Sequence, residues 1–368
     1  MSALSSGRVG LSFGATQLML NAVGTALRYG SIRQQFINSS KTREHYLLEY
    51  PLHQHRLIPL FAEAVAYKMV MKWTLLEWRK LTPDKLIDVK FTGTAQAHGV
   101  SACLKSLVKW RTMAALQECR EACGGHGYSQ FSRYGQWKDD YDVNLTWEGD
   151  NNILLQQTSR WLLTSYQKGR LEIYESTKPL AEEMKSEFDP KDVKGALLWR
   201  VQWLLQDAVM AIGKDGIQAW NALQPIVLKK LALSMAEYFS AERLYQELQI
   251  LNGDTKSLIE DILEIFCTHR ILEDIGEFYR GGFINPDQHA ELKFKLRAQL
   301  EAILPNLMPM VNALMSPDEL VGSSLGHSDR KNLYSRYLTA VREAKGFHLK
   351  TRKWKRLFPR PAAPRPRL

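Results

Sequence analysis

Cysteine is scarce in this sequence of 368 residues. The four cysteines, Cys103, Cys119, Cys123 and Cys267, are too few for a disulfide framework in a chain of this length, and they indicate a reducing compartment. Cys119 and Cys123 are four residues apart and would share one helical face, but no further ligands of similar spacing lie nearby. We therefore expect buried thiols and no metal site.

Long apolar runs are also missing. No stretch reaches the roughly 18 uninterrupted apolar residues that a membrane span requires. The nearest, residues 57–71, contains Glu63 and Lys68 and is typical of a helix packed within protein. Residues 1–8 lack the apolar segment of a secretory signal peptide. With 45% hydrophobic and 24% charged residues, the composition is that of a soluble globular protein.

Acidic residues are absent from residues 345–368, which contain nine basic ones. Subtracting these nine from the net charge of +10 leaves about +1 for the rest of the chain. A segment of arginine, proline and alanine cannot build a core, so we expect a solvated, disordered tail at 346–368. Binding to nucleic acid through this tail is the weaker interpretation, because the body has neither a basic patch nor a recognition motif.

Helical periodicity dominates the sequence, and no strand alternation is evident. Four long helices are predicted and indicate an all-α fold that begins with a helical bundle: Leu11–Phe36, Leu57–Trp78, Thr92–Glu121 and Asn152–Tyr166. Further helices at Ile217–Leu251, Lys256–Tyr279 and Asp287–Ala313 predict a second helical domain. We place the bundle at 1–175 and the second domain at 176–345. Asn285-Pro286 and Ser316–Glu319 have the order of helix starts, and the second also has capping-box spacing.

The residues with the strongest chemical character lie near residue 148. The run Thr146-Trp147-Glu148-Gly149-Asp150-Asn151-Asn152 follows Cys123-Gly124-Gly125-His126-Gly127-Tyr128 by about twenty residues. A glycine beside a carboxylate allows close approach of another backbone. Each of these segments, taken alone, also has a purely structural interpretation. Glu148 would be a surface residue in a loop, and Asp150 and Asn152 would cap the following helix. The glycines would form a turn that ends a helix.

Together these segments resemble the C-terminal half of the acyl-CoA oxidases, which are related to the acyl-CoA dehydrogenases. Gly7-Arg8-Val9, Arg33-Gln34-Gln35-Phe36 and Val321–Gly326 extend the resemblance from about residue 7 to about residue 347. The resemblance implies that Glu148 is the general base that removes a proton beside the thioester carbonyl. It also implies that Glu148 and Gly149 bind the substrate, with the amide of Glu148 on the thioester oxygen.

The resemblance further implies that FAD is the cofactor. The residues that it assigns to FAD are Arg33, Gln35, Phe36, Gly124, Gly125, Gly127, Asp150 and Asn152. Arginine suits a diphosphate because its planar donors bind oxygens in pairs. Arg33 and the glycine turn are implied to reach the flavin of a second subunit, so a homodimer is expected. Ile37 and Asn152 depart from the residues that many relatives have at these positions.

The implied activity is oxidation of fatty acyl-CoA to trans-2-enoyl-CoA with reduction of O2 to H2O2. In the family an N-terminal helical domain and a β-domain precede the segment matched here. We therefore expect a fragment or short isoform with little activity alone. A non-catalytic helical interaction protein derived from this fold is the alternative. Family resemblance implies a peroxisomal location, but Pro366-Arg367-Leu368 departs from the usual Ser-Lys-Leu signal, which leaves a cytoplasmic location as the alternative.

Overall fold

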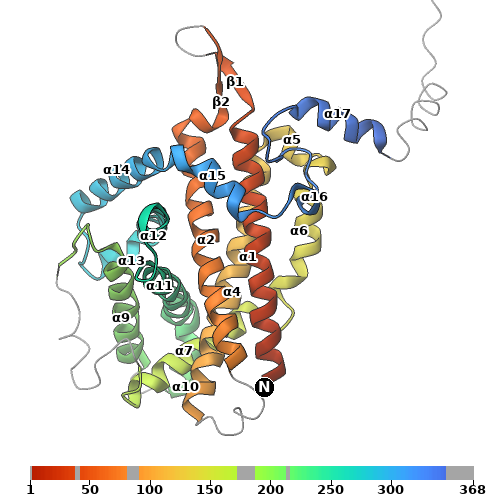
Figure 1. Cartoon of the computed structure of the whole chain (residues 1–368). Coiled ribbons are helices and arrows are strands. Elements are labelled where there is room, and N and C mark those ends of the chain that lie inside the picture. Colours follow the sequence, from red (N-terminus) through yellow and green to blue (C-terminus); the bar gives the residue numbers. More distant parts are fainter. Residues whose placement is uncertain (1, 38–41, 81–90, 172–186, 213–215, 345–368) are drawn as a thin grey trace, which may run out of the picture.

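Four long helices form the body of the computed structural model, which describes residues 2–37, 42–80, 91–171, 187–212 and 216–344 (Figure 1). They are α1 (Ser2–Gly30), α2 (Pro51–Lys80), α4 (Phe91–Ala122) and α7 (Asn151–Gln167). Helix α1 packs against α2 and α4, and α4 packs against α7. Fully buried apolar side chains such as Met19, Phe61 and Leu104 fill the space between them. The predicted helical bundle is confirmed.

A short β-hairpin follows α1, where the sequence predicts more helix. Strand β1 (Gln34–Ile37) pairs antiparallel with β2 (Glu44–Tyr46), with a bulge between Gln35 and Ile37 (Figure 1). The prediction that helix continues to Phe36 is therefore wrong. Strands this short carry too few residues for a visible alternation, which is why the sequence does not indicate them.

Short elements connect the bundle helices. They are η1 (Leu47–Glu49), α5 (Gly124–Tyr128), η2 (Gln130–Ser132), α6 (Tyr134–Asp142) and η3 (Val143–Leu145). Helix α6 packs along α4 and returns the chain toward the N-terminal end of α1. This return brings the loop before α7 beside the first turns of α1.

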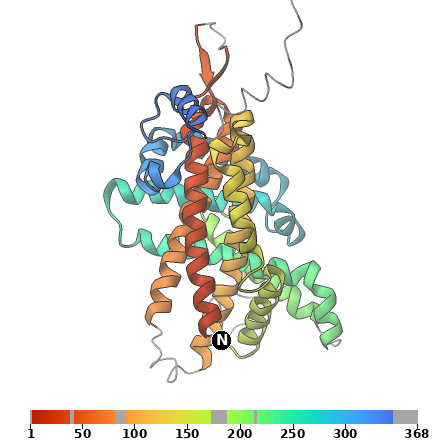
Figure 2. The ribbon, with the colours of Figure 1, turned by 90° about the vertical axis from the view of Figure 1, so that its right-hand side faces the viewer.

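A second set of helices packs against the bundle (Figures 1 and 2). It comprises α9 (Val193–Ile212), α10 (Gly216–Leu223), the π-helical turn η4 (Gln224–Leu228), α11 (Lys229–Leu248), α12 (Gly253–Glu273), α13 (Ile275–Arg280), α14 (Pro286–Ala302), α15 (Leu304–Leu314), α16 (Asp318–Val321) and α17 (Leu333–Glu343). The three helices predicted here are each broken once, at η4, at Asp274 and at Ile303. Proline follows within two residues at the first and third breaks.

The two predicted helix starts behave differently. Asn285 forms a capping box with Gln288, as its sequence indicates. The capping box predicted at Ser316–Glu319 is wrong, because no side chain caps α16. The Ser316 hydroxyl instead accepts a hydrogen bond of 3.1 Å from Asn21 on α1.

A buried ionic network joins α2 and α4 to α11 and α12. Glu63, with no exposed surface, accepts hydrogen bonds from Arg111 at 2.6 and 2.8 Å and from Arg270 at 3.2 Å. Arg270 also pairs with Glu237, whose other oxygen pairs with Arg200. Burial alone would raise the pKa of Glu63, but the charges of Arg111 and Arg270 hold it well below its usual range. The network therefore fixes how the second set of helices sits on the bundle.

The state of the cysteines is the remaining prediction about the fold that the described residues test. All four cysteines are buried free thiols, as predicted. Among the described residues, no His, Cys, Asp and Glu cluster has the arrangement of a metal site, and no helix is long and apolar enough to cross a membrane. The predicted boundary at residues 175 and 176, the tail 346–368 and the terminal Pro366-Arg367-Leu368 lie outside the described residues.

Candidate functional site

The loop between η3 and α7 presents Glu148 on a strained backbone. Glu148 has φ of 59° and Gly149 has φ of 112°, both in the region that favours glycine. Asp150 then caps α7, since its carboxylate accepts hydrogen bonds from the amides of Asn152 (2.9 Å) and Ile153 (3.2 Å). A non-glycine residue at positive φ persists only where its surroundings hold it there.

The first turns of α1 hold Glu148 from one side. Arg8 Nε donates to the carbonyl oxygen of Glu148 at 2.8 Å. The carboxylate lies against Gly7, where a Cβ atom would be 2.4 Å from Oε1. Within the described part of the chain, the buried Oε2 of Glu148 has no hydrogen-bond donor. A half-buried carboxylate with an unpartnered oxygen is suited to accept a proton from a bound molecule.

Two buried lysines of α4 hold the loop from the other side. Lys105 Nζ donates to the carbonyl of Gly149 and to Oδ1 of Asn151, both at 2.7 Å. Lys109, one turn further on, lies 3.3 Å from Asn144 Oδ1. Burial lowers the pKa of Lys105 to about 8, and burial together with the charge of Lys105 lowers the pKa of Lys109 to about 7. The loop thus rests on a pair of weakly basic amines.

Sequence reasoning gave no role to Arg8, Lys105 or Asn151. The spacing of Lys105 and Lys109, four residues apart on one face of a long helix, is a signal that could have pointed to them. Lysines on a buried helix face need polar partners, so such a pair indicates a polar segment packed against that face. The helix-cap interpretation of Asp150 is confirmed by its hydrogen bonds. Asn152 is exposed on the first turn of α7. The flavin contacts assigned to Asp150 and Asn152 remain predictions.

The glycine run lies at the far end of the bundle. Gly124 has φ of 58°, and a Cβ atom on Gly125 would have no other atom within 4 Å. A Cβ on Gly127 would lie 2.0 Å from the carbonyl oxygen of Arg120, so only glycine fits there. His126 Nδ1 is 2.9 Å from the hydroxyl of Tyr29 on α1. The turn is therefore pressed against the last turn of α1.

Arg33, Gln35 and Phe36 lie beside this turn. Arg33 bonds to the hydroxyl of Tyr334 and, at 2.8 Å, to Oε1 of Gln35. Phe36 is 69% exposed with φ of 61°, so its ring projects from the hairpin and does not enter the core. The ring of Tyr334 also packs edge-on against that of His126, with centroids 5.9 Å apart.

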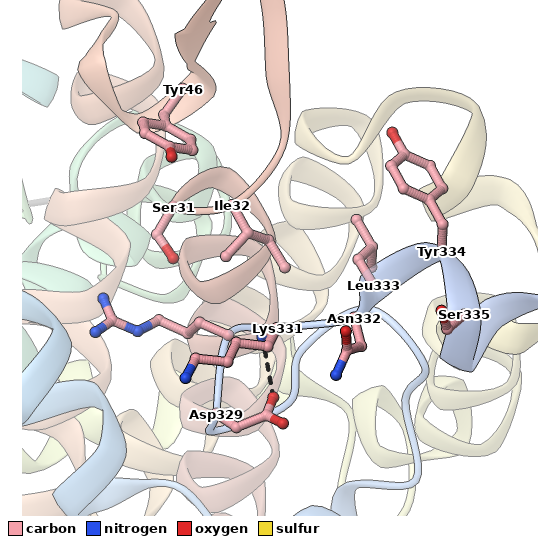
Figure 3. A pocket seen from close by; sticks show the side chains of 10 residues that line it. Ser31, Ile32, Tyr46, Asp329, Lys331, Asn332, Leu333, Tyr334 and Ser335 are labelled. Carbon is pink, nitrogen blue, oxygen red and sulfur yellow. Dashed lines mark hydrogen bonds between the residues drawn. The ribbon is translucent and has the colours of Figure 1, made fainter.

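A pocket of about 550 Å³ opens between the end of α1, the hairpin and the segment that leads into α17 (Figure 3). Its lining mixes polar and apolar surface and comes from three parts of the chain: Ser31 and Ile32, Tyr46, and residues 329–335. Asp329 accepts a hydrogen bond of 3.1 Å from the amide of Lys331, as Figure 3 shows. This pocket and the glycine turn occupy the same end of the molecule.

The predicted site residues thus fall into two groups. Glu148, Gly149, Asp150 and Asn152 lie at the N-terminal end of α1, whereas Arg33–Phe36 and Gly124–Gly127 lie at its C-terminal end (Figures 1 and 2). From Gly7 to Gly30, α1 spans about 35 Å at 1.5 Å per residue. One chain therefore does not bring the two groups together.

Comparison with known families gives a consistent match over both sets of helices. The family model "Acyl-CoA oxidase, C-alpha1 domain" matches residues 1–163, and the model "Acyl-CoA oxidase" matches residues 189–362. Peroxisomal acyl-coenzyme A oxidase 3 of Homo sapiens is 29% identical over 92% of this chain and 53% of that protein. Peroxisomal acyl-coenzyme A oxidase 2 of Arabidopsis thaliana is 29% identical over 92% and 51%.

Solved structures agree with these matches. An acyl-CoA oxidase from tomato is similar with a TM-score of 0.85 and 25% identity, over 96% of this chain and 57% of that one. Acyl-CoA oxidase-1 of Caenorhabditis elegans, solved with FAD and ATP, has a TM-score of 0.83 over 96% and 57%, and at 21% identity it supports the fold alone. The chain spans about half the length of the curated relatives that it matches.

Proposed function

Because this chain belongs to the acyl-CoA oxidase family, we propose that it supplies the general base and the flavin-contact segments of an FAD-dependent oxidase of fatty-acid β-oxidation. The substrate is a fatty acyl-CoA, which becomes trans-2-enoyl-CoA while O2 is reduced to H2O2. Bound FAD supplies the hydride acceptor and the reaction with oxygen. The observation that carries the proposal is Glu148, held at positive φ with one buried oxygen that has no donor among the described residues.

The residues around Glu148 have distinct tasks in this proposal. Oε2 of Glu148 takes the proton from the carbon beside the thioester carbonyl. Arg8 and Lys105 fix the loop on its two sides, and Gly7 leaves room for the carboxylate. No acceptor in the described ranges takes the amide hydrogen of Glu148, which leaves that N–H for the thioester oxygen.

The far end of the bundle fits one edge of a flavin nucleotide. Gly124 and Gly125 have open space where side chains would stand, so the main chain is accessible to a ligand. Arg33 adds a guanidinium group suited to a diphosphate. These residues would hold the adenine and diphosphate portion of FAD. Asp150 and Asn152, which lie at the other end of α1 beside Glu148, would also contact the flavin nucleotide.

A homodimer reconciles the two separated groups. In this arrangement Arg33 and the glycine turn of one copy serve the flavin that faces Glu148 of the other. Large apolar side chains are exposed at the hairpin end: Phe36 (69%), Ile37 (61%), Leu52 (73%) and Tyr128 (81%). Burial of such a surface by a second copy would favour association.

We place the protein in the peroxisome, since the human and Arabidopsis relatives described above are named as peroxisomal. A cytoplasmic location is the alternative. Expression of the chain as a fusion to a fluorescent protein tests this directly. Co-localisation with a peroxisomal marker supports our assignment, and diffuse fluorescence contradicts it.

The decisive test of the proposed function is flavin chemistry in the purified chain. Because the chain spans about half the length of its relatives, we expect bound FAD whose visible spectrum bleaches only slowly when acyl-CoA is added without oxygen, and no bleaching in Glu148→Gln. A protein that neither contains nor takes up FAD would overturn the enzymatic role for this chain. The non-catalytic helical partner would then be the better description, and the exposed hairpin end would be its binding surface.

A further inference from the structure

A second and larger pocket lies between α4, α7 and α11, and it includes none of the residues assigned to the proposed reaction. Its volume is about 860 Å³, within the range of about 300–1,000 Å³ typical of small-molecule sites. One of its lining residues, His98, contacts Arg8, with 3.3 Å between His98 Nδ1 and Arg8 Nη1. The pocket is therefore a neighbour of the Glu148 loop and is separated from it by Arg8.

The lining of this pocket is more apolar than polar. Its walls include the buried side chains Val100, Leu171, Met235, Tyr238 and Phe239. The indole of Trp161 is a further wall, and it lies flat on α4 because residue 99 is glycine. A Cβ on Gly99 would come within 2.5 Å of the Trp161 ring. These walls offer an apolar chain a surface against which it can bury its own apolar area.

The mouth of the pocket carries positive charge. Arg160, Lys168 and Arg170 are exposed at its edge, and within the described part of the chain none of them pairs with a carboxylate. The one carboxylate of the lining, Glu242, is paired with Lys194 at 2.6 Å. Arg243 stacks on Trp73, with 3.7 Å between its guanidinium carbon and the ring centroid.

The two remaining titratable side chains of the lining do not change this balance. Burial raises the pKa of Tyr238 to about 12, so its hydroxyl is neutral at pH 7. Burial and the neighbouring Arg8 lower the pKa of His98, so its imidazole is neutral at pH 7. An apolar cavity beneath cations that pair with no carboxylate of the described chain is complementary to a molecule with an apolar chain and an anionic head. The alternative is that these basic residues are an ordinary solvent-exposed surface. Such a surface would not account for the apolar cavity beneath them.

We propose that this pocket is a binding site for an amphiphilic anion, a linear hydrocarbon chain ending in a carboxylate or phosphate. The chain would lie between Trp161 and the wall formed by α11, and the head would sit between Arg160 and Arg170. The site is separate from the proposed catalytic loop and does not depend on flavin. Its test therefore stands whether or not the chain proves to be an enzyme.

Calorimetric titration of the full chain with decanoate, decyl phosphate and 1-decanol tests the proposal. We expect both anions to bind one per chain, at least about tenfold more tightly than the alcohol, and less tightly as salt rises. The ratio of the dissociation constants for decanoate and decyl phosphate shows whether the site prefers a carboxylate or a phosphate head group. Equal affinity for the alcohol, or several molecules bound per chain, would overturn the proposal.

Two variants assign the binding to this pocket. Arg160→Glu with Arg170→Glu should weaken both anions by at least about tenfold and leave 1-decanol unchanged. Val100→Phe should weaken all three, because it fills the interior. Lys293→Glu with Arg297→Glu, on the exposed face of α14, makes the same change in net charge and should have no effect. If Val100→Phe does not fold, the two charge-reversed proteins still decide, and equal binding by both contradicts the proposal.

Discussion

Gly7 of α1 lies so close to Glu148 that a methyl group on Gly7 would be 2.4 Å from Oε1 of the carboxylate. The absence of a side chain at position 7 is therefore part of what positions the proposed base. The carboxylate is the mobile end of a side chain, so it would move away from a methyl group while the helix stayed in place.

Replacing Gly7 with alanine should separate activity from stability. Alanine favours a helix by up to about 1 kcal/mol over glycine, so the melting temperature should stay the same or rise. Glu148 should be displaced, and bleaching of bound flavin by acyl-CoA should slow by about 100-fold or more. Gly10→Ala is the matched control, because its added Cβ would have no other atom within 4 Å. Equal rates in the two variants would contradict this positioning role.

Lys109→Met should stabilise the protein at neutral pH. Because burial holds the pKa of Lys109 near 7, the unfolded chain, with a lysine pKa of about 10.4, binds more protons between these values. The charged form therefore destabilises the fold at pH 7, and this cost disappears as pH rises toward about 10. We expect Lys109→Met to raise the free energy of unfolding by about 1–3 kcal/mol at pH 7.

Urea unfolding of both proteins at pH 7 and near pH 10 measures this effect. Cysteines and tyrosines also titrate in alkali, but they do so in both proteins. The difference in free energy of unfolding between variant and parent therefore reports on Lys109. The difference should shrink at the higher pH. A difference that grows with pH, or a variant less stable than the parent at pH 7, would show that the amine of Lys109 stabilises the loop.

Glu63→Gln should loosen the junction between the bundle and the second set of helices. Breaking a buried ion pair from one side costs about 3–5 kcal/mol. Here Arg111 and Arg270 would both lose the Glu63 carboxylate, while Arg270 would keep its pair with Glu237. Since the pKa of Glu63 is held well below its usual range, its contribution is present above about pH 4 and is lost as pH falls further.

Chemical unfolding at pH 7 and at pH 3 tests the role of Glu63. The loss of stability should be large at pH 7 and smaller at pH 3. Glu264→Gln is the control, because Glu264 pairs with Lys295 at 2.7 Å in a partly exposed position and such pairs contribute about 0–1 kcal/mol. Similar losses in both variants would mean that the buried network is no more important than a surface pair.

Gly127→Ala should disturb the glycine turn by moving the main chain. The added methyl group would meet the carbonyl oxygen of Arg120 at 2.0 Å, and a main-chain atom at the end of a packed helix cannot simply rotate away. We expect a lower melting temperature and weaker uptake of FAD. Gly125→Ala, whose methyl group would enter open space, should retain both properties. Unchanged FAD affinity in Gly127→Ala would remove this turn from the flavin site.

Mixing two inactive variants tests whether the separated groups act across a dimer. Arg33→Glu and Glu148→Gln should each abolish flavin bleaching alone. After unfolding and refolding together, a mixed dimer has one site with both defects and one intact site, so activity should return to about one quarter of the parent value for random pairing of obligate two-fold dimers. No recovery, despite mixed dimers seen by native mass spectrometry, would contradict the assignment of Arg33 to the flavin that faces Glu148 of the other copy.

The sequence predicted the helical bundle well because its four long helices carry strong apolar periodicity. It placed Glu148, Gly149 and Asp150 in a loop before a helix, and Asp150 does cap that helix. It failed at the end of α1, where the β-hairpin is too short to leave a pattern. It also failed at the breaks at η4, Asp274 and Ile303, which continuous periodicity obscured.

Local spacing in the chain is enough to predict the long helices and the residue types that stand beside Glu148. Tertiary structure alone decided that Arg8 and Lys105 hold the Glu148 loop from opposite sides, since both lie far from it along the chain. It also decided that Arg33 and Glu148 stand at opposite ends of α1. Distances of this kind depend on how helices pack, and helix packing is set by the whole buried surface and not by any one motif.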